Sequence, residues 1–88
     1  MLFSRQVERA IDVMLDINER GFVTRSSQKI DSIRYYMIIW QLRDNGLIEV
    51  DGVDNRNQKI WVLTAKGKKI TDKLKEIREI MGESNGEM

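Results

Sequence analysis

The sequence predicts a single α+β domain in which helices surround a two-stranded antiparallel hairpin. Apolar residues recur at helical spacing before residue 45 and after residue 64, whereas β-branched and aromatic residues are concentrated between them. A chain of 88 residues has room for one modest core. We therefore expect one domain over residues 1–82 and a disordered tail at residues 83–88.

The first helix is expected from Ser4 to Arg20. Apolar residues follow one side of this segment, and charged residues occupy the other. Ser4 suits the N-cap because its hydroxyl accepts a hydrogen bond from a free backbone amide. Gly21 suits the end of the helix because it adopts the left-handed conformation at low cost. The apolar side is expected to form the first layer of the core.

The segment that follows, up to residue 31, carries few apolar residues and predicts no full helix. Residues 21–24 can pair with the hairpin as a short strand. Ser26 or Ser27 can cap one short helix that Ile30 anchors to the core. Arg25 and the serines suit contacts to phosphates, and a polar surface loop is the alternative.

A third helical segment is expected from residue 31 or 32 to Asp44, and it is apolar on two sides. One side has the spacing of a core face and consists of Tyr35, Ile38, Ile39 and Leu42. The other side consists of Ile33, Tyr36, Met37 and Trp40. A helix that is apolar all round is normally buried all round, so the second side is expected to meet another surface.

A hairpin is expected directly after this helix, because Asn45-Gly46 is typical of a helix end. Residues 47–50 and 59–63 have strand composition, and residues 51–58 form a polar loop between them.

The last helix is expected from Thr64, as N-cap, to Met81, with Gly82 ending it. Its apolar residues repeat at the spacing of a coiled coil: Ile70, Leu74, Ile77 and Met81. This seam predicts either a helix-helix dimer or packing of the helix on its own domain.

Two motifs carry a resemblance to a known family. Residues 42–48 read Leu-Arg-Asp-Asn-Gly-Leu-Ile, and residues 61–68 read Trp-Val-Leu-Thr-Ala-Lys-Gly-Lys. In this order and at this separation, they resemble the winged helix-turn-helix regulators of the MarR, ArsR and PadR types. The resemblance implies a three-helix core, a two- to three-stranded antiparallel wing and an extra C-terminal helix. It also implies a homodimeric transcriptional regulator that binds specific double-stranded DNA.

The resemblance also implies positions for the site residues, since the family's recognition helix enters the major groove and the wing flanks it. The expected contacts of the recognition helix are Ser32, Arg34, Tyr36, Met37 and Gln41. The segment before it is expected to contribute Arg25, Ser26 and Ser27, and the wing Arg56, Asn57 and Lys59. The expected dimer interface consists of Trp40, Ile70, Leu74, Ile77 and Met81.

The distribution of charge favours a nucleic-acid partner, although the net charge is only +1. Residues 20–43 hold five basic residues against one acidic residue, and residues 56–69 hold five basic residues and no acidic one. These are the segments that would face phosphates in a winged helix. A chance clustering of solvated side chains is the alternative.

The composition argues against several other classes of protein. With no Cys and no His, the common metal ligands and catalytic triads are missing, so we expect no enzyme, metal or cofactor. No apolar run is long enough for a membrane span, so a cytoplasmic protein is expected. Abundant Ile, Lys and Glu favour a thermophilic, archaeal or archaeal-virus source. The sequence identifies no small-molecule effector.

A protein-interaction module is the rival function. In that case the same fold would be a scaffold, and the apolar stripe of Ile33, Met37 and Trp40 would meet a partner chain.

Overall fold

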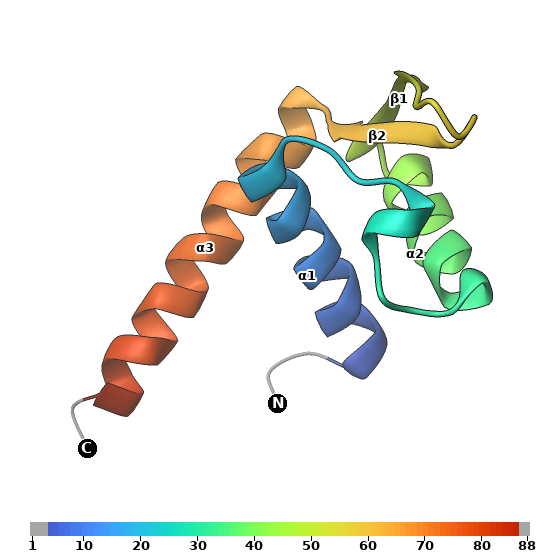
Figure 1. Ribbon diagram of the computed structural model, residues 1–88. Coiled ribbons are helices and arrows are strands. Elements are labelled where there is room, and N and C mark those ends of the chain that lie inside the picture. The colour runs from blue at the N-terminus through green and yellow to red at the C-terminus, as the bar shows by residue number, and fades with distance from the viewer. Residues whose placement is uncertain (1–3, 87–88) are drawn as a thin grey trace.

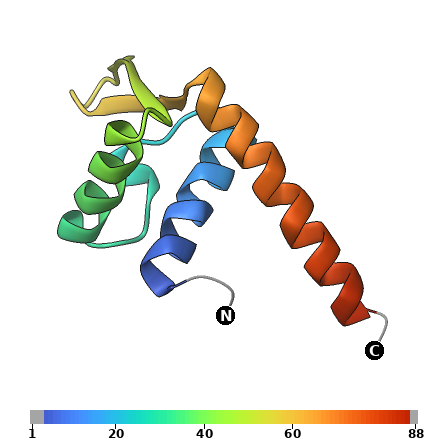
Figure 2. The same ribbon diagram turned by 180° about the vertical axis from the view of Figure 1, so that it is seen from behind.

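The computed structural model describes residues 4–86, in which three α-helices, one 3₁₀ helix and a β-hairpin follow one another. The elements are α1 (Arg5–Arg20), η1 (Arg25–Ser27), α2 (Ser32–Asp44), β1 (Ile48–Val53), β2 (Lys59–Leu63) and α3 (Ala65–Gly86). Figure 1 shows α1 between α2 and α3, with the hairpin across one end. Seen from behind in Figure 2, α1 begins and α3 ends at the opposite end. The expected α+β class is therefore confirmed.

Helix α1 begins and ends as the sequence predicts. The Ser4 hydroxyl accepts a hydrogen bond from the backbone N–H of Val7 at 3.3 Å. Gly21 adopts a left-handed conformation with φ 95°, and its N–H donates to the carbonyl of Ile17 at 2.7 Å. The apolar face of α1 is buried through Ile11, Val13, Met14 and Ile17.

The second helix of a standard helix-turn-helix is reduced to the single 3₁₀ turn η1. Thr24 precedes this turn, and its backbone N–H donates to the Ser27 hydroxyl, which donates in turn to the Thr24 carbonyl. Thr24 is therefore the capping residue, and the expected cap at Ser26 or Ser27 is wrong. Val23 pairs with Trp61 as a single bridge, which replaces the expected short strand. Ile30 packs against the core as expected.

Helix α2 has the predicted bounds and the predicted core face. Asp31 caps it by accepting a hydrogen bond from the backbone N–H of Arg34 at 3.0 Å, which lowers the pKa of the Asp31 carboxyl. At its other end Gly46, with φ 73°, donates to the Arg43 carbonyl, and the next N–H donates to the Leu42 carbonyl. These two bonds form a Schellman motif, which turns the chain directly into β1.

Strands β1 and β2 form an antiparallel hairpin that is longer than predicted. A β-bulge between Val50 and Val53 lets β1 continue through Gly52, whose φ is 102°. The connecting loop is therefore residues 54–58, and the expected loop over residues 51–58 is wrong in its first part. Polar residues can lie in a strand here because the outer hairpin meets solvent on both faces.

Helix α3 begins at the predicted cap but ends later than predicted. The Thr64 hydroxyl accepts from the Gly67 N–H at 3.0 Å and donates to the Gly46 carbonyl at 2.6 Å. The backbone stays helical past Gly82 to Gly86, so the expected tail does not begin at residue 83. Residues 87 and 88 lie outside the described part of the chain.

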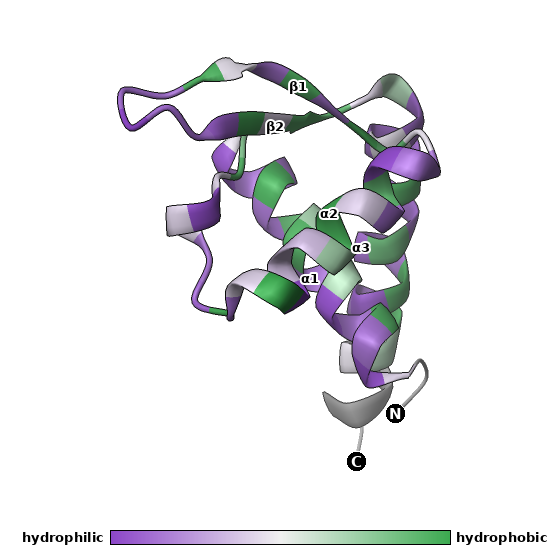
Figure 3. Cartoon of the chain, turned by 90° about the vertical axis from the view of Figure 1, so that its right-hand side faces the viewer, coloured by the Kyte–Doolittle hydropathy of each residue, from purple (hydrophilic) through white to green (hydrophobic). Residues whose placement is uncertain are grey.

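The core lies where α1, α2 and the base of the hairpin meet. Its most completely buried residues include Ile17, Val23, Tyr35 and Ile39. In Figure 3 hydrophilic residues colour the loop between the strands. The core thus fixes α2 against the hairpin and leaves the hairpin loop in solvent. Within residues 4–86, no helix is both long and apolar enough to cross a membrane.

Candidate nucleic-acid interface

The outward face of α2 presents most of the residues that the sequence assigns to a recognition helix. Ser32, Arg34, Tyr36, Met37 and Gln41 are all exposed. Tyr36 and Trp40 lie one helical turn apart, and their rings stack with centroids 5.8 Å apart and an interplanar angle of 28°. The opposite face of α2 packs in the core, which holds this aromatic pair outward.

The 3₁₀ turn η1 joins the start of α2 through Arg25. The Arg25 Nε donates to the Ser32 hydroxyl at 3.1 Å, and Nη1 donates to the Gln28 carbonyl at 3.2 Å. Its guanidinium also lies 5.5 Å from the centre of the Tyr35 ring. Arg25 therefore holds the turn to the helix while adding positive charge beside Tyr35.

The two serines expected to bind phosphate make hydrogen bonds inside the protein. Both the N–H and the hydroxyl of Ser26 donate to Oε1 of Gln58, at 3.2 and 2.9 Å. Ser27 is part of the Thr24 cap. These contacts tie η1 to the base of the hairpin loop, and they engage the serine groups that were expected to meet phosphates.

The hairpin loop is held in one shape by Asp54. One carboxylate oxygen of Asp54 accepts hydrogen bonds from the N–H groups of Arg56 and Gln58, at 2.9 and 2.8 Å. Asn57 takes a left-handed conformation with φ 63°, which Asn adopts more readily than most residues. The side chains of Arg56, Asn57 and Lys59 are exposed, as a wing that contacts DNA requires.

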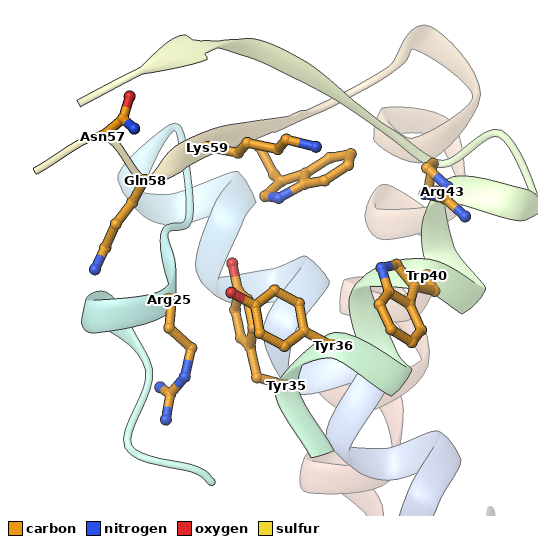
Figure 4. Close-up of a pocket in the computed structure, with 9 residues that line it drawn as sticks. Arg25, Tyr35, Tyr36, Trp40, Arg43, Asn57, Gln58 and Lys59 are labelled. Carbon is orange, nitrogen blue, oxygen red and sulfur yellow. The ribbon is translucent and has the colours of Figure 1, made fainter. Parts of the chain in front are cut away.

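A cleft of about 430 Å³ lies between α2, η1 and the hairpin. Three cations and four aromatic rings are among its nine lining residues: Arg25, Tyr35, Tyr36, Trp40, Arg43, Asn57, Gln58, Lys59 and Trp61. None of the nine is acidic. In Figure 4 the Tyr35 hydroxyl points toward the hairpin, the Tyr36 hydroxyl lies beside it, and Lys59 extends above them. The arrangement suits a flat, anionic group.

The Tyr35 hydroxyl is an exception among the buried polar groups of residues 4–86. It is buried, but it has no hydrogen-bond partner among the described residues. Burial raises the pKa of this phenol to about 12, with a further increase from Tyr36 and an opposing effect from Arg25. Tyr35 therefore stays neutral at ordinary pH and has a free donor at the cleft.

The structure divides the expected contact residues between two places. Arg25, Tyr36, Asn57 and Lys59 meet at the cleft described above. Arg34 and Met37 instead line a second groove, of about 320 Å³, together with Arg5, Gln6, Arg9 and Ile38. Ser32, Gln41 and Arg56 line neither.

Sequence reasoning missed five of the cleft residues: Tyr35, Trp40, Arg43, Gln58 and Trp61. Trp40 was expected at the dimer interface, Tyr35 was expected in the core, and Trp61 was expected only as a strand residue; Tyr35 and Trp61 are both buried. Arg43 lies one turn after Trp40 on α2, and this spacing is the one signal that could have placed it beside the aromatic pair.

The expected dimer interface is also divided. Ile70 and Leu74 pack against the core of their own domain, which agrees with the alternative in which the last helix packs on its own domain. Ile77 and Met81 are exposed further along α3. Trp40 lies on α2, and α1 separates α2 from α3 (Figure 1).

The fold defined by these elements is a winged helix, with α2 in the place of the recognition helix and the hairpin as the wing. The chain is similar to the protein AF1382 from Archaeoglobus fulgidus, with a TM-score of 0.73 and 25% sequence identity over 91% of each chain. It is also similar to a transcriptional regulator from Clostridium thermocellum, with a TM-score of 0.70 and 16% identity over 99% of this chain and 98% of that one. No family model and no curated protein matches the chain.

Proposed function

We propose that the protein is a transcriptional regulator of the MarR, ArsR and PadR kind that binds double-stranded DNA. The observation that carries the proposal is the meeting of Arg25, Arg43 and Lys59, from three separate segments, at a cleft with no acidic lining residue. The Clostridium thermocellum regulator has the same fold, which supports the proposal further. Positive side chains gathered on one face attract the phosphate backbone and release its counterions.

In the proposed complex α2 lies in the major groove and the wing follows the adjacent backbone. Arg34 has an exposed guanidinium that pairs with Asp31 at 3.4 Å on the protein surface. Because this ion pair is exposed, it is weak, and Arg34 can leave Asp31 to bind a guanine edge or a phosphate. Gln41 is exposed further along α2, where it can reach adenine. Arg56 at the wing tip is placed for a phosphate. The proposal assigns the protein no catalytic activity.

The proposal includes a homodimer formed by the C-terminal half of α3. Beyond Leu74, the apolar residues Ile77, Ile80 and Met81 are exposed on this helix. Exposed apolar residues that repeat along a helix suit a second copy of the same helix, since symmetric pairing covers both faces at once. Trp40 is left out of this interface, because α1 stands between it and α3.

Fluorescence anisotropy on duplex DNA at increasing salt tests the proposal. We expect the logarithm of the association constant to fall linearly with the logarithm of the salt concentration. Arg56→Ala should weaken binding to all sequences alike and reduce the slope by about 1, because one phosphate contact is lost. Lys75→Ala is the matched control: it removes the same charge from an exposed position on α3 and should leave the slope unchanged. A slope near zero for the unaltered protein would contradict DNA binding.

The second candidate is a protein-interaction module, which one specific observation favours. Ile33 is 75% exposed, and Met37 and Trp40 are about half exposed on the same helix. Such a patch suits a partner chain. Ile33→Ala distinguishes the two functions, because it should leave DNA affinity unchanged if α2 meets DNA through its polar and aromatic residues.

A further inference from the structure

The cleft between α2 and the wing has features that binding of an intact duplex does not require. Paired bases remain stacked within the double helix, and their flat faces are not accessible to protein. The cleft nevertheless presents aromatic rings outward. Tyr36 and Trp40 are 42% and 51% exposed, and they already stack on each other. Exposed stacked rings are platforms for a further flat group.

The polar groups of the cleft suit a phosphate. Lys59 has no carboxylate within ion-pairing distance among the described residues, and Arg25 bonds only to a hydroxyl and a carbonyl. Arg43 pairs with Asp44 at 3.0 Å, but both side chains are more than half exposed. Two or three cations are therefore free to meet an anion.

The Tyr35 hydroxyl and the side-chain amide of Gln58 add hydrogen-bonding groups to the lining of the cleft. The hydroxyl is buried and has no hydrogen-bond partner among the described residues, and the Tyr35 side chain forms part of the cleft wall. The Gln58 side chain uses its oxygen to accept from Ser26, which leaves its NH₂ group as a donor. A ligand that fills the cleft would satisfy the Tyr35 hydroxyl, which otherwise costs free energy.

We propose that this cleft binds one unpaired nucleotide, with its base stacked on the Tyr36–Trp40 pair and its phosphate near Lys59, which lies on the hairpin side of the rings (Figure 4). The Tyr35 hydroxyl donates to the same nucleotide. The proposal deepens the proposed function, since it rests on DNA being the partner and specifies a strand with an unpaired base. Stacking contributes without regard to the base, because every base has an aromatic face.

The experiment compares three probes: a blunt duplex, the same duplex with a single-stranded overhang, and free dTMP. Anisotropy measures the two DNA affinities, and quenching of tryptophan emission reports on the cleft, because Trp40 and Trp61 are the two tryptophans of the chain. We expect the overhang to raise affinity about tenfold over the blunt duplex, the effect of stacking roughly one base. Quenching should accompany this binding.

Two variants locate the effect, and one is a control. Trp40→Ala should abolish the tenfold preference and change blunt-duplex affinity much less. Tyr35→Phe should also reduce the preference while the protein stays folded, because the variant removes only the unpartnered hydroxyl. Ile33→Ala is the control, since Ile33 is exposed on α2 outside the cleft. It should keep the full preference.

The outcomes separate this proposal from the proposed function. Equal affinity for the blunt and overhang duplexes, without quenching by dTMP, would overturn the nucleotide site while DNA binding stands. A preference that survives both Trp40→Ala and Tyr35→Phe would also overturn it. Quenching by dTMP that Tyr35→Phe removes, in the absence of duplex binding, would support the nucleotide site, assign it to a free nucleotide and contradict the proposed function.

Discussion

At the scale of single residues, Tyr35 combines two roles that usually exclude each other. Its ring is 1% exposed and belongs to the core between α2 and the hairpin. Its hydroxyl has no hydrogen-bond partner among residues 4–86, although buried polar groups are normally paired. Such an arrangement lowers stability, and a protein keeps it more readily where the group serves a ligand.

We predict that Tyr35→Phe changes how stability depends on alkaline pH. The pKa of Tyr35 is raised to about 12 in the folded protein, against 10.0 in the unfolded chain. Between these values the unfolded chain loses the proton and the folded protein keeps it, so stability is full below pH 10 and falls as pH rises toward 12. Denaturant titrations at several pH values should show a smaller loss in Tyr35→Phe. Equal losses in both proteins would contradict the raised pKa.

At the scale of elements, the first turn of α3 crosses the chain just before β1 at very short range. A Cβ on Gly67 would collide with the carbonyl of Leu47, and this carbonyl also accepts from the Thr64 N–H at 3.0 Å. The close packing of α3 against the turn between α2 and β1 therefore requires a residue without a side chain at position 67. Gly67 belongs to the second motif that resembles the winged-helix family, residues 61–68. The contact with Leu47 gives a physical reason for a glycine at this position.

We predict that Gly67→Ala destabilises the protein by at least 1–3 kcal/mol, roughly the cost of overpacking a site that cannot relax. Gly82→Ala is the matched control on the same helix. No atom lies within 4 Å of a Cβ added there, so alanine should raise stability by about 0.5–1 kcal/mol through its helix propensity. Thermal unfolding of both variants measures the contrast. Similar effects at the two positions would show that the close approach is not rigid.

The elements also show how far the sequence predicts this fold. Helix α2, its Asp31 cap and its four core residues follow from local signals, because helical spacing and capping act within a few residues. The 3₁₀ turn and the bulge at Gly52 were not predicted. Each depends on distant partners, since η1 is held by Gln58 and the bulge exists only in a paired strand.

At the scale of the whole molecule, α3 has two halves with different surroundings. The first half packs Ile70 and Leu74 against the core. Further along, Arg78 forms ion pairs with Glu8 at 3.3 Å and Asp12 at 2.7 Å, which hold α3 to α1 across the surface. Beyond these contacts the helix leaves its apolar residues exposed. The spacing of the seam was predicted from the sequence, but its division between core and surface depends on where α1 begins, because α3 continues past the first turns of α1.

We predict that Ile80→Glu converts a dimer into folded monomers. Ile80 is 60% exposed, so its replacement leaves the domain core intact and places a charge in the proposed interface. Sedimentation at roughly tens of micromolar should detect the change, since micromolar association is largely complete there. Lys75→Glu introduces the same side chain at an exposed position on the opposite side of the same helix and should leave the dimer unchanged. Leu74→Glu does not serve as this test, because Leu74 packs against the core. An unaltered protein that is already monomeric would contradict the dimer.

The sequence predicted only part of the candidate site, because local patterns do not show which segments of the chain meet. Tyr36, Asn57 and Lys59 were expected as contacts, and each was assigned from its own segment. The cleft they share with Arg43 and Gln58 arises only when the wing folds over α2. Local patterns predict which side chains are exposed, whereas the meeting of side chains from separate elements requires the tertiary fold.

The paired hydrogen bonds from Ser26 to Gln58 have a consequence for the thermodynamics of binding. They connect η1 to the wing across 32 positions of the chain, while Asp54 fixes the loop beyond. A wing held in this way has already lost much of its conformational freedom when the protein folds. Association then immobilises fewer backbone torsions, and the entropy lost on forming the complex is smaller than for a free hairpin loop. In the proposed complex, the Gln58 side chain would therefore contribute to affinity by holding η1 and the wing together before binding.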